Sequence, residues 1–174
     1  MMDYIQFKTC RKCGTKTERS LDEETAAFVQ TRQWSITCPN CNSKILNEGC
    51  NTPPLTYDLL KKWARNDSLQ FIEQDEDIIL ADNNRLGLLL DIFDSDKTTE
   101  YKRGIIIQAL CVLLYDNLAS KEDNPESDRK IADRIVRELN ERKNMVKLGK
   151  GQFIEPYIEK VVFPVIGFEI AWNI

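Results

Sequence analysis

Histidine is absent from the 174 residues of this chain. Its absence excludes every Ser/His/Asp and Cys/His nucleophilic mechanism, every metal site with an imidazole ligand, and the most common general base of enzymes. Most familiar classes of hydrolase therefore do not fit the composition. The content of 42% hydrophobic and 30% charged residues is typical of a globular protein that buries a core.

Long apolar runs are also missing. The most apolar stretch, residues 105–115, is interrupted by Gln108 and is much shorter than the roughly 20 residues that span a bilayer. It predicts a buried helix instead of a membrane span. The N-terminal residues show no basic segment followed by a long apolar one, so no secretory signal is predicted. We therefore expect a cytoplasmic protein.

Six cysteines are present, and in a reducing cytoplasm clustered cysteines bind metal more often than they form disulfides. Four of them form two C-x-x-C pairs. Such a turn points both sulfur atoms inward, and its backbone N–H groups hydrogen-bond to the sulfur charge. The predicted metal ligands are Cys10, Cys13, Cys38 and Cys41. Of the other two cysteines, Cys111 is predicted to be a small core residue, and Cys50 is either an additional ligand or an exposed thiol.

Four thiolates, in a chain that offers no imidazole, are the natural ligands of Zn²⁺. They complete a tetrahedron and leave no open position for water, so the predicted zinc ion is structural and not catalytic. Two alternatives stay open, because an iron–sulfur centre uses the same four ligands and a redox-active cysteine pair uses the same spacing.

The residues that follow the two cysteine pairs support a shared turn geometry. Gly14 and Asn42 occupy the same place after each pair, and both tolerate the left-handed backbone that such a turn needs at its exit. Together with the cysteine spacing, residues 7–46 resemble a zinc ribbon of the four-cysteine type. The resemblance implies two cysteine knuckles carried on a β-hairpin that the ion holds together.

The segment between the two cysteine pairs carries β-forming residues. Residues 15–19 and 31–37 are the expected strands. The polar connection at residues 20–24 reads as a turn, although Ser20-x-x-Glu23 can also form a capping box that opens a short helix.

Two consecutive prolines, Pro53 and Pro54, mark a predicted domain boundary at residues 51–54. The predicted domains are a zinc ribbon over residues 1–50 and an α-helical domain over residues 55–174. In the second domain the apolar residues repeat at helical spacing. This spacing predicts helices over residues 57–65, 86–93 and 127–147, and the apolar run at residues 105–115 lies in a further helix predicted over residues 99–118.

The predicted fold is therefore a small β zinc ribbon followed by an all-α domain. Helical hairpins joined by polar loops over residues 84–148 resemble HEAT-like α-helical repeat proteins, and a compact helical bundle is the competing interpretation. A repeat fold implies a scaffold that binds macromolecules and has no catalytic centre of its own.

The negative charge is concentrated in residues 67–96, which carry nine acidic residues and a single basic one, Arg85. Such a segment attracts basic protein surfaces, although an ordinary solvated face has the same composition. The predicted function is a non-enzymatic protein-binding module, such as an immunity protein that inhibits a basic nuclease toxin. The predicted partner-binding residues are Glu73, Asp75, Glu76, Asp77, Asp91, Asp94 and Asp96.

Basic residues support an alternative function, a zinc-ribbon protein associated with nucleic acid. Lys8, Arg11, Lys12 and Lys16 lie near the first cysteine pair, and residues 129–150 carry a basic stripe. Because the whole chain is acidic, with a pI near 5.1, nonspecific binding to phosphate is expected to be weak at physiological salt. A metal-dependent enzyme that uses Asp91 or Asp94 is a third interpretation.

Overall fold

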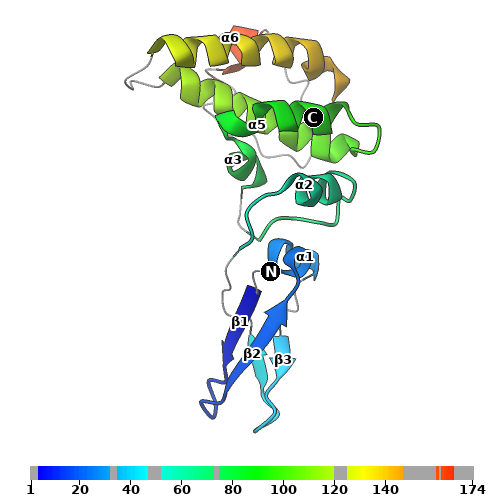
Figure 1. Cartoon of the computed structure of the whole chain (residues 1–174), viewed down its shortest axis with the longest axis vertical. Coiled ribbons are helices and arrows are strands. Elements are labelled where there is room, and N and C mark those ends of the chain that lie inside the picture. The colour runs from blue at the N-terminus through cyan, green and yellow to red at the C-terminus, as the bar shows by residue number, and fades with distance from the viewer. Residues whose placement is uncertain are drawn as a thin grey trace. The chain divides into compact units, whose positions relative to one another are not determined.

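The computed structural model describes residues 4–31, 35–46, 52–72, 75–119, 125–146, 160 and 162–166. It divides the chain into two compact units, Met1–Gln74 and Asp75–Ile174 (Figure 1). The N-terminal unit contains small antiparallel sheets, and the C-terminal unit is mostly helical. This order agrees with the predicted sequence of a small β part followed by helices. The observed division lies after the boundary predicted at residues 51–54.

The β part consists of two separate hairpins, each a two-stranded antiparallel sheet. Strand β1 (Tyr4–Thr9) pairs with β2 (Lys16–Leu21), and β3 (Ser35–Thr37) pairs with β4 (Lys44–Leu46). Each C-x-x-C pair therefore lies in the turn of its own hairpin. The sequence had predicted only β2 and β3, as the strands of one hairpin. The structure differs because each cysteine turn folds the chain back on itself.

A short helix, α1 (Glu23–Ala27), follows β2. Its N-terminal cap is Asp22, whose Oδ1 accepts a hydrogen bond from Thr25 N–H at 2.8 Å. The predicted cap at Ser20 is wrong, because β2 extends through that residue and pairs it with Ile5. The helix itself is present, as the capping-box alternative expected.

An aromatic cluster joins α1 to helix α2 (Tyr57–Ala64). Phe71 stacks on Phe28 with ring centroids 5.4 Å apart and on Trp63 with centroids 5.6 Å apart. All three rings are buried, and Phe28 and Phe71 also form a β-bridge. This packing explains why α2 belongs to the N-terminal unit, although the two prolines before it suggested a boundary.

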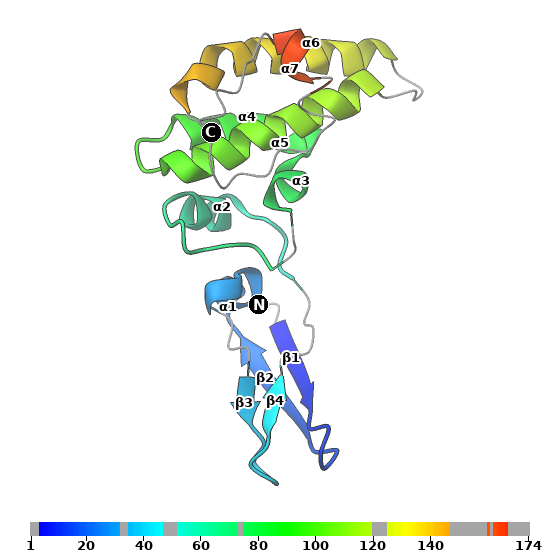
Figure 2. The ribbon, with the colours of Figure 1, turned by 180° about the vertical axis from the view of Figure 1, so that it is seen from behind.

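The C-terminal unit is built around one long helix. Helix α5 (Glu100–Ala119) contacts α3, α4 and α6, and residues 104–114 are all buried. Figure 2 shows α6 running alongside α5. The neighbouring elements are α3 (Glu76–Leu80), the 3₁₀ turn η2 (Asn83–Arg85), α4 (Leu86–Asp94), α6 (Pro125–Arg142), the 3₁₀ turn η3 (Lys143–Met145) and α7 (Phe163–Ile166).

The helices predicted from periodicity agree with α2, α4, α5 and α6, apart from a few residues at their ends. Helix α3 was not predicted, because five residues are too few to show a period. Among the helices of the described ranges, none is both long and apolar enough to cross a membrane.

Candidate metal centre

The first cysteine turn is closed by two backbone hydrogen bonds. Cys10 N–H donates to Thr15 O at 2.9 Å, and Gly14 N–H donates to Cys10 O at 2.7 Å. Gly14 has a φ of +72°, a left-handed conformation that costs glycine nothing. The turn therefore brings Cys10 and Cys13 to one side, as the sequence predicted.

The second cysteine turn repeats this pattern. Cys38 N–H donates to Ser43 O at 2.8 Å, and Asn42 N–H donates to Cys38 O at 3.0 Å. Asn42 has a φ of +55°, and asparagine is one of the few residues besides glycine that adopt this region readily. The two turns are thus equivalent, with Asn42 in the place of Gly14.

The sulfur atoms of the two turns meet in one cluster. Cys10 Sγ lies 3.5 Å from Cys41 Sγ, and Cys13 Sγ lies 3.6 Å from Cys38 Sγ; the four Sγ atoms all lie within 4.8 Å of one another. A tetrahedral ion with metal–sulfur bonds of about 2.3 Å places its ligands about 3.8 Å apart. Disulfide-bonded sulfurs lie much closer, at about 2.05 Å, and these cysteines are free. The predicted ligands can therefore hold one metal ion.

Two hydroxyl groups contact the sulfur atoms, and the sequence analysis missed both. Thr15 Oγ1 lies 3.0 Å from Cys13 Sγ. Ser43 Oγ lies 2.9 Å from Cys41 Sγ and 3.2 Å from Cys10 Sγ. Both residues follow the left-handed position of their turn, and a hydroxyl at the same place in both turns was the signal that could have revealed them.

These hydrogen bonds favour the thiolate form that a metal requires. The Thr15 hydroxyl and backbone N–H lower the pKa of Cys13 to about 5. The Ser43 hydroxyl is the main reason why the pKa of Cys10 lies below its ordinary value. Burial raises the pKa of Cys38 instead. The positive charge of a bound metal ion therefore stabilises the thiolate form of Cys38.

We expect the Ser43→Ala variant to bind the metal about tenfold more weakly, because outer-shell hydrogen bonds typically contribute that much to affinity. Competition with a chromophoric chelator measures the change. Ser20→Ala, which removes an exposed hydroxyl from β2, is the matched control and keeps the wild-type affinity. Equal affinities of the two variants would contradict a role for the Ser43 hydroxyl.

The remaining two cysteines lie apart from this cluster or outside the described residues. Cys111 is buried in α5, and burial raises its pKa to about 12, which keeps it an inert thiol. This agrees with the predicted core role. Cys50 lies outside the described residues.

Lys8 is buried, with only 1% of its surface exposed. Its Nζ atom has no hydrogen-bond partner among the residues that the structure describes. Burial and the Arg19 charge lower its pKa. Lys8 is therefore not available to contact nucleic acid, which corrects its place in the alternative prediction.

The predicted partner-binding residues do not form one free surface. Asp75, Asp91 and Asp96 are exposed, and no salt bridge joins them to another described residue. Asp77 is partly buried, and burial together with the neighbouring Asp75 charge raises its pKa. Glu73 lies outside the described residues.

Two of the predicted residues form internal ion pairs. Glu76 Oε2 lies 3.5 Å from Lys102 Nζ. Asp94 accepts two hydrogen bonds from the Arg142 guanidinium, at 2.7 and 3.0 Å. These carboxylates therefore connect α3 to α5 and α4 to α6. Sequence reasoning missed this role, because the partner residues are distant in the chain.

The predicted basic stripe of α6 is partly engaged in the same way. Arg142 also binds Glu138 Oε2 at 2.6 Å, in an i, i+4 pair on one face of the helix. Arg129, Arg134 and Arg137 are exposed, and residues 147–150 lie outside the described ranges.

Comparison with protein-family models, with curated proteins and with solved structures finds no match to this chain. The assignment of the metal centre therefore depends on its own geometry.

Proposed function

We propose that the four cysteines hold a structural Zn²⁺ ion in a four-thiolate zinc ribbon. The closed donor set supports this proposal, because four sulfurs already complete a tetrahedron and leave no position for substrate or water. The ion joins two hairpins that contribute two ligands each. It thus acts as the core of a part of the chain that has little apolar core of its own.

In the C-terminal unit we favour a compact bundle over a HEAT-like array. A repeat array stacks similar hairpins so that each contacts only its neighbours along the array. Here α5 is a central helix that α3, α4 and α6 contact from different parts of the chain. A central helix that several other helices contact is typical of a bundle with a single hydrophobic core.

The protein as a whole is, in this proposal, a cytoplasmic, non-enzymatic module that binds a basic protein surface, as an immunity protein binds a cationic nuclease toxin. The supporting observation is that Asp75, Asp91 and Asp96 are exposed and form no salt bridge with any residue in the described ranges. Arg85, the basic residue within this segment, is engaged by Asp82 at 3.7 Å and by the Ile79 carbonyl at 2.9 Å. Negative charge therefore dominates the segment and favours a cationic partner.

Removing the three carboxylates tests the proposal. Asparagine is the suitable replacement, because Asp75 has a φ of +64° and asparagine tolerates this conformation. We expect the triple variant to bind a captured basic partner about tenfold more weakly and with a shallower dependence on salt. Cross-linked capture from cell extract identifies the partner, and titration of the purified partner measures its affinity.

A matched triple variant separates this surface from general negative charge. It replaces exposed aspartates outside the segment: Asp58→Asn, Asp116→Asn and Asp133→Asn. The proposal requires that this control keep wild-type affinity. If both triple variants bind equally well, the segment at residues 75–96 is not the docking surface.

A further inference from the structure

Strand β1 has its apolar residues outside and its polar residues inside. Ile5 and Phe7 are 37% and 51% exposed, whereas Gln6 and Lys8 are buried. Side chains alternate between the two faces of a strand, so Ile5 and Phe7 lie together on the outer face of the β1–β2 hairpin. An apolar pair on the face that water reaches is the reverse of the usual pattern and marks a contact surface.

The register of the hairpin places a cation beside Phe7. Lys16 is opposite Thr9, and Glu18 is opposite Phe7, so Lys16 is a diagonal neighbour of Phe7 on the same face, within about 8 Å. Beyond the strand end, the turn adds the exposed side chains of Arg11 and Lys12. The outer face and the adjoining turn thus combine an exposed aromatic ring with three exposed basic residues.

These cations are not neutralised by acidic residues of the described chain. Among the residues that the structure describes, none forms a salt bridge with Arg11, Lys12 or Lys16. Glu18 is the one acidic residue on this face, and it opposes the three basic residues. A positive surface that carries an exposed ring binds a flexible polyanion whose bases can stack, which is the chemistry of single-stranded nucleic acid.

We infer that the outer face of the β1–β2 hairpin binds single-stranded nucleic acid, with a base stacked on Phe7 and phosphates on Lys16, Arg11 and Lys12. This site adds the exposed Phe7 to the basic residues predicted from the sequence and omits the buried Lys8. It lies on the N-terminal unit and shares no residue with the acidic surface proposed above. The two proposals can therefore succeed or fail separately.

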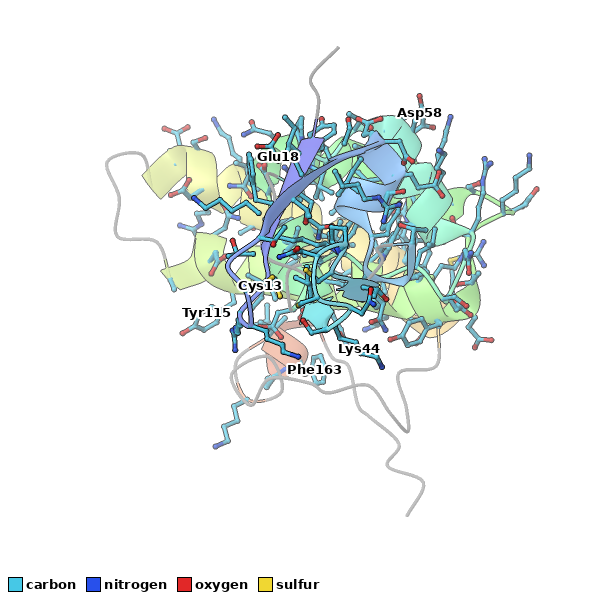
Figure 3. The ribbon with its side chains drawn as sticks, turned by 90° about the horizontal axis from the view of Figure 1, so that it is seen from below. Cys13, Glu18, Lys44, Asp58, Tyr115 and Phe163 are labelled. Carbon is cyan, nitrogen blue, oxygen red and sulfur yellow. The ribbon has the colours of Figure 1, made fainter. Side chains whose placement is uncertain are left out.

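The second hairpin offers a matched control. Lys44 follows the second cysteine turn as Lys16 follows the first, and it is also exposed. Figure 3 shows Lys44 and Glu18 on opposite sides of Cys13, so Lys44 lies away from the Glu18 position of the proposed face. Comparing Lys16→Gln with Lys44→Gln thus distinguishes a built face from diffuse attraction to the cationic end of the ribbon.

The experiment titrates the full metal-loaded chain into a short labelled oligothymidylate and follows its fluorescence anisotropy at several salt concentrations. We expect Phe7→Ala and Phe7→Leu to weaken binding about tenfold, because base stacking needs an aromatic ring. Phe7→Trp, which keeps a ring, is expected to bind as the wild type does. Lys16→Gln weakens binding and lowers the salt slope by about 0.7, whereas Lys44→Gln does neither. Glu18→Gln tightens binding.

Several outcomes overturn the inference. One is equal binding by wild type, Phe7→Ala and Phe7→Leu, and another is an equal effect of Lys16→Gln and Lys44→Gln. A third is that an oligoglutamate peptide binds as tightly as the oligonucleotide. The face would then bind an acidic protein and not nucleic acid. Metal content of each variant confirms that the ribbon is folded, and Phe7 is exposed enough that its replacement leaves the fold intact.

Discussion

We expect the Cys38→Ser variant to bind no stoichiometric metal and to lose the fold of both hairpins. The buried apolar cluster of the two hairpins consists of Cys10, Cys38 and Ile45, with Cys41 packed against it. All but Ile45 are proposed ligands, so in this proposal the metal takes the place of an apolar core. In small zinc domains the ion contributes on the order of 10 kcal/mol, and isolated two-stranded hairpins are marginal without such support. Native mass spectrometry measures the metal, and amide exchange in β1–β4 measures the fold.

A chelator is expected to reproduce the effect in the wild-type chain. The aromatic cluster of Phe28, Trp63 and Phe71 and the C-terminal unit have apolar cores of their own, so their amide protection persists. Cys111→Ala is the control variant, because this cysteine is buried in α5 and is not a ligand. A chain that keeps one metal ion per molecule after Cys38→Ser, or whose hairpins stay protected in chelator, contradicts the proposed centre.

The cysteine centre was predictable because its information is local. Spacing within each C-x-x-C turn and the left-handed positions of Gly14 and Asn42 depend on a few adjacent residues, and the structure has them as predicted. The helical spans were predictable for a similar reason, since apolar residues repeat at helical spacing along α4 and fill a continuous stretch of α5. Strand β1 escaped prediction because its buried positions are the polar Gln6 and Lys8, which reverses the expected alternation.

The ion pairs of the acidic segment were not predictable from the sequence, because they depend on tertiary contacts. A run of carboxylates shows charge but not which of them meet cations from elsewhere in the chain. Asp94 meets Arg142 from α6, and Glu76 meets Lys102 from α5. Both pairs join residues far apart in sequence, so composition could not distinguish them from the exposed Asp75 and Asp96.

The Glu76–Lys102 pair leads to the second large expected effect. We expect Glu76→Gln to destabilise the C-terminal unit by about 3–5 kcal/mol, because removing one partner of a buried ion pair leaves a desolvated charge behind. The Lys102 side chain is 0% exposed and that of Glu76 is 14% exposed, so the ammonium cannot regain water without opening the α3–α5 contact. Denaturant unfolding, followed by amide exchange in α3 and α5, measures the loss.

Burial, and not the distance between the charges, determines the size of this effect, and a second ion pair of the same unit shows the difference. Glu126 and Lys130 are closer, at 2.8 Å, but their side chains are 80% and 75% exposed. Glu126→Gln is therefore expected to cost less than about 0.5 kcal/mol. Adding Lys102→Met to Glu76→Gln removes the buried charge and restores most of the stability, because an apolar side chain of similar length suits a dry site. If Glu76→Gln costs no more than Glu126→Gln, or if Lys102→Met gives no recovery, the pair does not hold α3 against α5 as a buried charge contact.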